Sequence, residues 1–437
     1  MNILQIIPGS GGSFYCGNCL RDSKYFDALR SLGHHVTKIP MYLPLFADEH
    51  DLNTIPVFYG AISIYLKQKY PIFRGAPLWF DNMLNSKPML KLAARQAGST
   101  RATGLEDMTI SMLLGEEGKQ SEELERMTDW IAEYCKPDVI HLSNALLLGL
   151  AHRLKEKLNV PVFCSLQDEN VWVDVMRPKY RDEVWSLMSE KASYVDAFIS
   201  VSDYYGELSR QRMNLPAEKV QTVYLGVDPA DYVYKSSAEK DRTIGFISRM
   251  SHENGLDILV DAFALLKRKP GFDDVKLLIT GGYTGDDKKF LKGIHKTIRK
   301  NNLTDQVVFQ EEFEGEDRLK FFEKVSVVSV PVRIGEAFGI YLTESMASGI
   351  PVIQPALGAF PEIVNAAGGG AVYNENTPKG LSEALETYLN DKASFEGHSQ
   401  KARKSIEEQF NINKLAAQLI EVYHKSINNP EYASIGK

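Results

Sequence analysis

The feature that most constrains the fold is an alternation of strand-like and helical patterns that starts twice along the chain. The first start is an apolar run at residues 2–7, followed by a Gly-rich turn at residues 8–12. A helical pattern that ends at Gly33 comes next, and a second apolar run follows at residues 35–39. A strand, a turn, a helix and a strand in this order open a doubly wound α/β domain, so the sequence predicts parallel sheets covered by helices.

The alternation resumes after residue 137 and restarts at residue 243, beyond a polar, aperiodic stretch at residues 232–242. A chain of 437 residues exceeds what one hydrophobic core usually serves, so this stretch is predicted to link two domains. The predicted strands lie at residues 138–142, 160–166, 197–201, 220–224, 243–247, 275–280, 307–309, 326–330 and 352–354, with helices at 146–158 and 255–267.

These patterns predict an N-terminal Rossmann-like domain at residues 1–235 and a C-terminal Rossmann-like domain at residues 243–412. Residues 44–125 mix aromatic, proline and charged residues without a steady period, and we interpret them as a helical insertion on the first domain. Core packing is favoured for the aromatic residues there over an acceptor or membrane surface. A C-terminal helix at residues 413–437 is expected to pack back across both domains. Ligands of doubly wound sheets bind outside the carboxyl ends of the strands, so the two domains are expected to face a cleft.

Composition excludes several classes of protein. The net charge of -7 gives no general case for nucleic acid, which needs a basic surface. No apolar run approaches the ~20 residues of a membrane span, and the N-terminus does not read as a signal peptide. Four cysteines do not make a disulfide framework, so we predict a reduced, cytoplasmic protein, with peripheral contact at the inner face of the membrane left open. The Cys16-x-x-Cys19 pair has no second pair for zinc and no thioredoxin-like surroundings, so redox or metal chemistry is disfavoured.

The most informative stretch lies at residues 329–353. A buried strand is predicted to end at Pro331, a polar loop carries Glu336, and a helix that begins near Phe338 holds Glu344. The backbone N–H groups of residues 337–340 would then lie at a helix N-terminus, where they suit an anion such as a diphosphate. The two carboxylates would accept hydrogen bonds from hydroxyls rather than contact phosphate.

This stretch carries a specific frame, Gly-Glu-x-Phe-Gly followed by Glu-x-Met-Ala-x-Gly-x-Pro-Val, at residues 335–352. Further matching pieces lie at residues 219–228, at Ser248-Arg249 before Gly255-Leu256, and at residues 358–364. In these residues the chain resembles glycosyltransferase family 4, most strongly from about residue 137 to 410. The resemblance implies the GT-B fold and a retaining transferase, hexosyl or similar, that uses a nucleotide sugar.

The resemblance also implies roles for particular residues. Glu336 would contact hydroxyls of the donor sugar, Glu344 the ribose of the nucleotide, and Arg249 the leaving diphosphate. The further donor-site residues expected are Ala337, Phe338, Gly339, Ile340, Gly282 and Arg333. No metal and no other cofactor is expected, because cationic side chains and a helix N-terminus can stabilise the leaving group. The expected co-substrate is a nucleoside diphosphate sugar of the UDP or GDP type, and the expected role of the enzyme is in carbohydrate biosynthesis.

The chain departs from the family pattern near the diphosphate. The family usually has Lys five residues after the arginine, whereas Asn254 takes this catalytic position here, and Arg333 or Arg21 are candidates to compensate. On the first domain, the residues expected at an acceptor or phosphate loop are Gly11, Gly12, His141, Gln167 and Asp168. A core histidine is the alternative for His141. A nicotinamide site is disfavoured because Phe14 takes the place of the third glycine.

The leading hypothesis is therefore transfer of a sugar from a nucleoside diphosphate to an unidentified acceptor, with a cell-envelope glycan or lipid favoured. The alternative is a non-catalytic GT-B protein that binds a nucleotide or a glycan, which Asn254 motivates. A third alternative is another enzyme of the same architecture, such as a sugar phosphorylase or an epimerase. A phosphorylase is disfavoured because neither a pyridoxal-phosphate lysine nor an orthophosphate site is evident. The Lys-rich run at residues 288–300 is predicted to be a solvated helix face.

Overall fold

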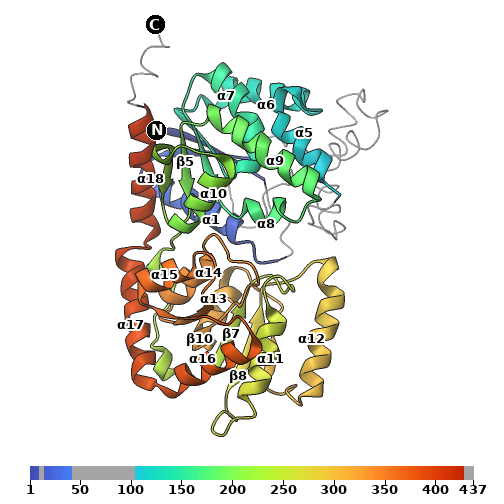
Figure 1. The fold of residues 1–437 in the computed structure, drawn as a ribbon. Coiled ribbons are helices and arrows are strands. Elements are labelled where there is room, and N and C mark those ends of the chain that lie inside the picture. Colours follow the sequence, from blue (N-terminus) through green and yellow to red (C-terminus); the bar gives the residue numbers. More distant parts are fainter. Residues whose placement is uncertain (9–13, 42–103, 428–437) are drawn as a thin grey trace. The chain divides into compact units, whose positions relative to one another are not determined.

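The computed structural model describes residues 1–8, 14–41 and 104–427 of the chain (Figure 1). The described residues form two compact units. The first unit contains residues 1–8, 25–41, 104–223 and 416–427, and the second contains residues 14–24 and 224–415. The segment at residues 14–24 therefore belongs with the second unit, although it follows the first strand of the chain.

The first unit is built on a six-stranded parallel sheet with strand order β2-β1-β3-β4-β5-β6. The chain moves from β1 to β2 on one side and continues into β3 on the other, so the switch point of the sheet lies between β1 and β3. In register, Ile3 of β1 pairs with Val36 on one side and with Val139 on the other. The strands are β1 (Asn2–Ile7), β2 (His35–Pro40), β3 (Val139–Leu142), β4 (Val162–Leu166), β5 (Ala197–Ser200) and β6 (Val220–Thr222).

Helices cover this sheet, and one segment predicted as an α-helix is partly a 3₁₀ helix. The segment predicted as one helix at residues 146–158 is a 3₁₀ helix, Ala145–Leu150, followed by α7, Ala151–Leu158. A Cβ on Gly149 would lie 2.0 Å from the carbonyl oxygen of Met112, so two backbones meet there and the first turns tighten. The other helices of this unit are α5 (Glu106–Leu114), α6 (Ser121–Trp130), α8 (Glu169–Val173), α9 (Pro178–Lys191) and α10 (Asp203–Met213), with α1 (Gly17–Ser31) and α18 (Ile412–Ile427) shared with the second unit.

The described part of the predicted insertion begins at residue 104 and is largely helical, whereas the insertion itself remains a prediction. The α5 helix and the first part of α6 cover residues 106–125 apart from a short connection. The rest of the predicted insertion, residues 44–103, lies outside the described residues.

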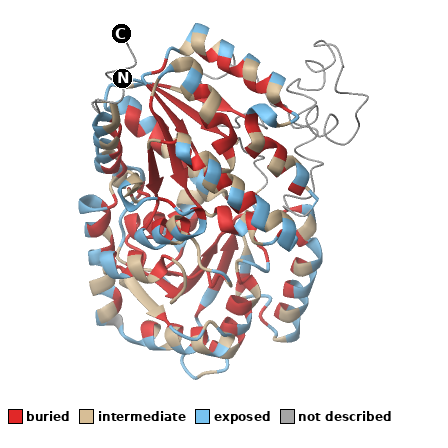
Figure 2. Cartoon of the chain, turned by 45° about the horizontal axis from the view of Figure 1, so that its top comes forward, coloured by how far each residue is buried: buried red, intermediate tan, exposed pale blue. Residues whose placement is uncertain are grey.

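The second unit has a six-stranded parallel sheet with strand order β12-β11-β10-β7-β8-β9. This is the strand order of dinucleotide-binding Rossmann sheets, and its switch point lies between β7 and β10. Figure 2 shows the strands of each sheet as mostly buried, as parallel sheets with helices on both faces require. The strands are β7 (Thr243–Ile247), β8 (Lys276–Thr280), β9 (Val307–Phe309), β10 (Val327–Val328), β11 (Val352–Pro355) and β12 (Gly370–Tyr373).

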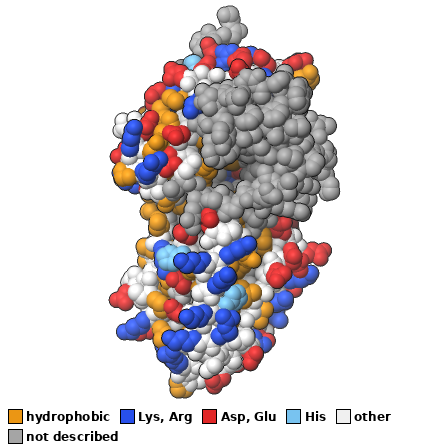
Figure 3. Space-filling model, turned by 90° about the vertical axis from the view of Figure 1, so that its right-hand side faces the viewer, with side chains coloured by type: hydrophobic (Ala, Val, Ile, Leu, Met, Phe, Trp, Pro, Cys, Tyr) orange, Lys and Arg blue, Asp and Glu red, His pale blue; other side chains and the backbone are white. Residues whose placement is uncertain are grey.

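Helices of the second unit connect these strands. They are α11 (Leu256–Leu266), α12 (Lys288–Lys300), α13 (Gly315–Lys324), α14 (Ile340–Ala347), α15 (Phe360–Ala367), α16 (Pro378–Asn390) and α17 (Lys392–Glu408). Basic side chains gather on the face of this unit that Figure 3 presents, and Lys289, Lys292 and Lys296 of α12 are exposed. The predicted solvated helix face at residues 288–300 is confirmed. Within the described part of the chain, no helix combines the length and the apolar character needed to cross a bilayer.

Candidate functional site

The loop between β10 and α14 carries the first part of the candidate site. It lies at the carboxyl end of a strand beside the switch point of the second sheet, where ligands of such sheets bind. The α14 helix begins at Ile340, after Gly339 with a φ of 85°. The first N–H groups of a helix have no acceptor within the helix, so this end of α14 offers donors to an anion.

Glu336 lies directly over the start of α14. Its side chain is half-buried, and its Oε2 atom is 3.0 Å from the place where a Cβ on Gly339 would lie. The loop is held from the other side by residues 335 and 358, because a Cβ on Gly335 would lie 2.2 Å from the backbone nitrogen of Gly358. Two separate pieces of the sequence frame therefore meet as touching backbones, and together they fix the place of Glu336.

Glu344 lies inside α14 and is completely buried. The hydroxyl of Tyr15 donates to its Oε2 atom at 2.5 Å, and the hydroxyl of Tyr232 donates to its Oε1 atom at 2.8 Å. The Nε atom of Arg318 forms an ion pair with the same Oε1 atom at 3.0 Å. Burial, together with the negative charge of Glu344, raises the pKa of Tyr15 and that of Tyr232 well above 10, so both hydroxyls remain donors.

Arg249 follows β7 and is bound by an acidic side chain of its own unit. Its guanidinium donates to both carboxylate oxygens of Asp287, at 2.9 and 3.1 Å, and to the hydroxyl of Thr284 at 2.9 Å. The guanidinium also lies 5.4 Å from the centre of the Phe14 ring. Burial alone would raise the pKa of Asp287, but the hydrogen bonds from Arg249 and Thr284 outweigh it and hold that pKa below 3.8. Arg249 and Asp287 therefore form a charged pair at the predicted diphosphate position.

The neighbouring predicted residues are also engaged by the protein. The side-chain amide of Asn254 donates to the Ser248 hydroxyl at 2.8 Å and to the backbone oxygen of Arg249 at 3.0 Å. Arg333 forms two hydrogen bonds with the carboxylate of Asp257, at 3.0 and 2.7 Å. Asn254 thus shapes the loop that carries Arg249, and Arg333 contributes a second neutralised arginine.

Gly282 and Arg21 are further predicted positions of the second unit, as are Ala337 and Phe338, which are buried. Gly282 accepts a hydrogen bond from the backbone of Met250 and forms a β-bridge with Phe14. Arg21, a candidate to replace the missing lysine, is buried and donates from Nε to Asp22 at 3.0 Å. Each arginine proposed for the diphosphate, at positions 249, 333 and 21, is therefore paired with an aspartate.

His141 of β3 is enclosed within the first unit. One ring nitrogen, Nδ1, lies 2.5 Å from the Tyr423 hydroxyl of α18, and the other, Nε2, lies 2.7 Å from the Ser165 hydroxyl. Both ring nitrogens are used, and the residue is 6% exposed. This geometry corresponds to the core-histidine alternative, since a hydrogen-bonded, buried imidazole ties α18 to the sheet.

The end of β4 has a different character. The side-chain nitrogen of Gln167 donates to the Ser143 carbonyl at 2.5 Å, whereas its Oε1 atom is buried without a hydrogen-bond partner among the described residues. The same holds for the Oδ1 atom of Asn170, a residue that the sequence analysis did not select. Asp168 lies between them with a φ of 58°, a left-handed conformation that aspartate tolerates better than most residues. These two amide oxygens can accept hydrogen bonds from a hydroxylated ligand. Gly11 and Gly12 lie outside the described residues.

Models of known protein families identify the family of this chain. A model of glycosyltransferase family 4 matches residues 116–231, and a model of the group 1 glycosyl transferases matches residues 233–410. Together they match well over half of the chain. The chain is a member of glycosyltransferase family 4.

Relatives and solved structures agree with this family. An uncharacterized glycosyltransferase of Methanocaldococcus jannaschii is 24% identical over 304 residues, which cover 66% of this chain and 75% of the relative. The lipopolysaccharide core biosynthesis mannosyltransferase LpsB of Rhizobium meliloti is 25% identical over 274 residues, 62% of this chain and 73% of the relative. The structure of HepE from Anabaena in complex with UDP has a TM-score of 0.67 at 17% identity, covering 97% of this chain and 100% of that chain. The likeness to this structure over nearly the whole chain confirms the predicted GT-B fold.

The cysteine pair of this glycosyltransferase requires a correction. The cysteine content predicted a reduced protein, whereas a disulfide joins Cys16 and Cys19 in the structure. The physical reason is local: Cys16 directly precedes α1 and Cys19 lies in its first turn, and their Cα atoms are 5.4 Å apart, within the usual range for a disulfide. Within the described residues, neither Cys135 nor Cys164 forms a disulfide.

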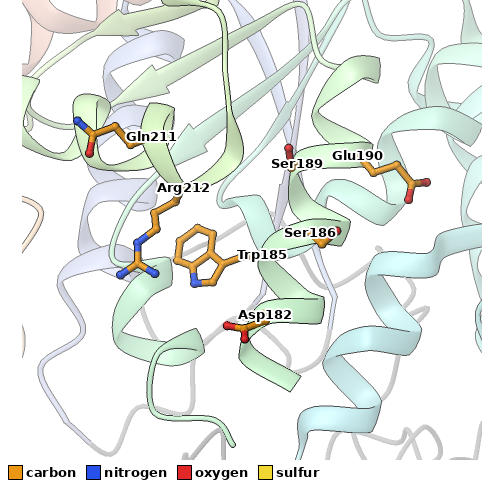
Figure 4. Close-up of a pocket in the computed structure, with 7 residues that line it drawn as sticks. All are labelled: Asp182, Trp185, Ser186, Ser189, Glu190, Gln211 and Arg212. Atoms are coloured by element: carbon orange, nitrogen blue, oxygen red, sulfur yellow. The ribbon is translucent and has the colours of Figure 1, made fainter. Parts of the chain in front are cut away.

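Two other features of the glycosyltransferase do not coincide with the predicted site. A shallow groove in the first unit is lined by Trp185 of α9 and Arg212 of α10, among other residues (Figure 4). None of the predicted site residues lines it, and Arg212 lies over the Trp185 ring at 5.4 Å. His152 also lies near Glu116 and Glu156 in a metal-like arrangement, but Glu116 and Glu156 are exposed, as carboxylates without a metal commonly are.

Three residues that engage Glu344 were missed by sequence reasoning. Tyr15 lies 329 positions away in the chain and Tyr232 lies 112 positions away. No local pattern marks these tyrosines or Arg318 as partners of a carboxylate. Only the folded second unit, which includes residues 14–24, brings them together.

Proposed function

We propose that this chain transfers a glycosyl group from a nucleoside diphosphate sugar of the UDP type to a hydroxylated acceptor, with retention of the anomeric configuration. The observation that carries the proposal is Glu336 lying over the N-terminus of α14 at the switch point of a Rossmann sheet. A carboxylate that accepts hydrogen bonds from sugar hydroxyls then lies beside a helix N-terminus whose N–H groups donate to phosphate. A sugar diphosphate needs both kinds of contact. Complexes of the similar HepE with UDP and with UDP-glucose support the choice of base.

The chemistry assigns a role to each group. As the bond from the anomeric carbon to the diphosphate breaks, negative charge builds on the leaving oxygen. The N-terminus of α14 and Arg249 would stabilise that charge, because donors that are already oriented need no reorganisation during the reaction. Glu336 would hold hydroxyls of the donor sugar and thereby fix the position of the anomeric carbon. Retention follows if the acceptor attacks from the side of the leaving group, with no protein nucleophile.

The first unit is proposed to bind the acceptor. The amide oxygens of Gln167 and Asn170, which have no hydrogen-bond partner among the described residues, would accept hydrogen bonds from its hydroxyls, because a buried acceptor gains most from a partner that fills its open position. Acceptor binding is thereby proposed for the predicted N-terminal domain at residues 1–235, apart from residues 14–24 and 224–235, which belong to the second unit. Donor binding is proposed for the predicted C-terminal domain at residues 243–412. A cell-envelope glycan is the proposed acceptor class, in keeping with the lipopolysaccharide enzyme among the relatives. The acceptor contacts proposed from the sequence at Gly11 and Gly12 belong to the same proposal.

A second candidate function has a specific observation behind it. Asn254 replaces the usual lysine, and Arg249 is already paired with Asp287. Such a site could bind a nucleotide or glycan without stabilising a leaving diphosphate enough for transfer. The alternative is therefore a non-catalytic GT-B binding protein.

One experiment separates the two. The purified chain is incubated with UDP-sugars, with and without glycan acceptors, and release of UDP is followed together with the anomeric configuration of the product by NMR. The proposal expects UDP release and retention, and a loss of about 100-fold or more in Glu336→Gln, by analogy with removal of one transition-state contact. Glu383→Gln, an exposed change on α16, is the matched control and should keep full activity. Binding of UDP without any release of UDP from the sugar conjugate would favour the non-catalytic alternative.

A further inference from the structure

A short segment of the chain lies on the donor residues of the second unit. Tyr15 donates to Glu344, the Phe14 ring lies under Arg249, and Phe14 forms a bridge with Gly282. The backbone N–H of Tyr15 also donates to the Gly281 carbonyl at 2.8 Å. One stretch of the protein itself therefore contacts the residues predicted for the ribose and for the diphosphate.

The next residues of this segment reach the start of α14. A Cβ placed on Gly17 would be 3.4 Å from the Cγ2 atom of Ile340, in van der Waals contact. The segment Phe14–Gly17, which we term the strap, thus touches Glu344, Arg249, Gly282 and Ile340, all of which belong to the predicted donor site.

The strap leads directly into the Cys16–Cys19 disulfide. Cys16 precedes α1 and Cys19 lies in its first turn, and both side chains are half-buried, which leaves them accessible to a small thiol. A CxxC pair at a helix N-terminus is the arrangement that favours the thiolate and thiol–disulfide exchange, because the helix end stabilises negative charge. The two cysteines outside this disulfide differ from the pair: Cys164 is fully buried, and burial raises the pKa of the Cys135 thiol to about 11.

We propose that Cys16 and Cys19 form a redox-active pair that controls donor binding through Tyr15. The disulfide holds the strap on the donor site, and its reduction allows Tyr15 to leave Glu344. This inference rests on the proposed function, because it takes Glu344 to be the acceptor for the nucleotide ribose. A dithiol reductant supplies the two electrons: the Cys16–Cys19 bond breaks, two cysteine thiols form with the two protons, and the reductant becomes a disulfide.

Geometry explains the coupling between the disulfide and Tyr15. The disulfide closes a ring of four residues across the first turn of α1, and Tyr15 is bonded directly to the first of them. The ring restricts the direction in which the chain leaves the helix, and the hydrogen bond from the Tyr15 backbone to Gly281 then sets its side chain on Glu344. Reduction removes the covalent restriction and leaves only the hydrogen bonds and packing.

Competition explains the effect on the nucleotide. Glu344 has no exposed surface, and the Tyr15 hydroxyl occupies its Oε2 atom. Because the carboxylate is completely buried, a ribose hydroxyl can reach Oε2 only if the Tyr15 hydroxyl gives way. The apparent dissociation constant of the nucleotide then rises in inverse proportion to the fraction of molecules in which Tyr15 has left.

The test measures UDP binding by calorimetry with the oxidised and the reduced full-length chain. If the released state is about one tenth populated in the oxidised protein, reduction tightens UDP binding about tenfold. The Cys16→Ser/Cys19→Ser double variant should bind UDP as the reduced protein does under both conditions. Cys135→Ser is the matched control and should keep the redox dependence.

A second variant and a second measurement test the role of Tyr15 independently of the cysteines. Tyr15→Phe keeps the ring but removes the hydroxyl, so in the oxidised state it should bind UDP as tightly as the reduced wild type. Hydrogen exchange at the Tyr15 amide, which donates to Gly281, should accelerate on reduction in the absence of any nucleotide. Unchanged exchange, or equal UDP affinity of oxidised and reduced protein, would overturn the redox control while leaving the transferase proposal intact.

Failure of the proposed function has a different signature. If no UDP or UDP-sugar binds to the reduced protein, to Tyr15→Phe or to the double cysteine variant, the donor site itself is wrong. Both the proposed function and the control of donor binding would then fall, even if exchange at Tyr15 responds to reduction.

Discussion

The predicted donor residues and the predicted acceptor residues differ in how far the protein satisfies them. In the second unit, Glu344 is held by two tyrosine hydroxyls and Arg318, and Arg249 is held by Asp287. In the first unit, the Oε1 atom of Gln167 lacks a hydrogen-bond partner within the described part of the chain. A ligand at the donor residues must therefore exchange with contacts that already exist, whereas a ligand near Gln167 would add a contact. The affinity for the donor therefore depends on how many of these existing hydrogen bonds and ion pairs the protein must break.

The largest effect is expected from removing the centre of the donor network. Glu344→Ala deletes a fully buried carboxylate and leaves the charge of Arg318 without this counter-ion and two tyrosine hydroxyls without this acceptor. Loss of one partner of a buried ion pair costs about 3–5 kcal/mol, so the free energy of unfolding should fall by that amount in urea titrations.

A gentler change tests the same network. Tyr232→Phe removes one hydroxyl, and its cost should be nearer the ~1 kcal/mol of a single hydrogen bond. If Glu344→Ala unfolded at the same urea concentration as the wild type, the network would contribute no stability, and the contrast between the two regions would collapse.

The acceptor side should respond in activity. Gln167→Ala removes the unpaired amide oxygen together with a hydrogen bond to Ser143, and a lost contact to an acceptor hydroxyl of ~1–3 kcal/mol should lower kcat/KM for transfer about 5- to 150-fold. Hydrolysis of the donor in the absence of acceptor should be unchanged.

A matched substitution sharpens this result. Ser165→Ala removes a hydroxyl that bonds His141 in the same sheet, so it controls for loss of a buried polar group. Equal loss of transfer in both variants would show that Gln167 acts through the stability of the sheet rather than on the acceptor.

The sequence predicted the sheets because buried parallel strands read as apolar runs. The strands at residues 243–247 and 307–309 have the predicted bounds. β10 is only Val327–Val328, shorter than predicted, because the apolar run continues past the residues that pair with its neighbours. β12 was not predicted, since it begins at Gly370 after two further glycines and has too short an apolar run to stand out.

In the candidate site, contacts between residues close in the sequence could be predicted, whereas contacts between distant residues could not. A motif frame placed Glu336 and Gly339 beside one another, because their spacing across a loop and a helix start is local. It carried no information on Tyr15, whose contact with Glu344 spans 329 positions, or on Asp287, which neutralises Arg249. Contacts of this kind depend on how the sheet brings strand ends together.

A pH experiment tests whether Arg249 is held as the structure indicates. The pKa of Asp287 is lower in the folded protein than the ordinary value of 3.8. Its ionised carboxyl therefore contributes stability above pH 3.8, and this contribution is lost as the pH falls through the folded-state pKa. Asp287→Asn should lose less stability than the wild type over that acid range, as measured by urea unfolding at each pH.

The control for this experiment is Asp305→Asn, an exposed aspartate of the same unit. Its acid profile should follow that of the wild type. Identical profiles for Asp287→Asn and the wild type would contradict the pairing, and Arg249 would then be available to a diphosphate without exchange.

The smallest effect is expected from restoring the usual charge. Asn254→Lys adds a cation beside the loop of Arg249, and an exposed charge pair of up to ~1 kcal/mol corresponds to roughly fivefold tighter UDP binding by calorimetry. Asn254→Gln keeps an amide that can still donate to Ser248 and controls for the change in size. Tighter binding only in the lysine variant would show that the donor site lacks positive charge because Arg249 is already paired. Unchanged UDP binding with unchanged stability would mean that another group neutralises the charge of the diphosphate. The existing contacts that a donor must displace would then be those between the strap and Glu344 rather than those of the arginines.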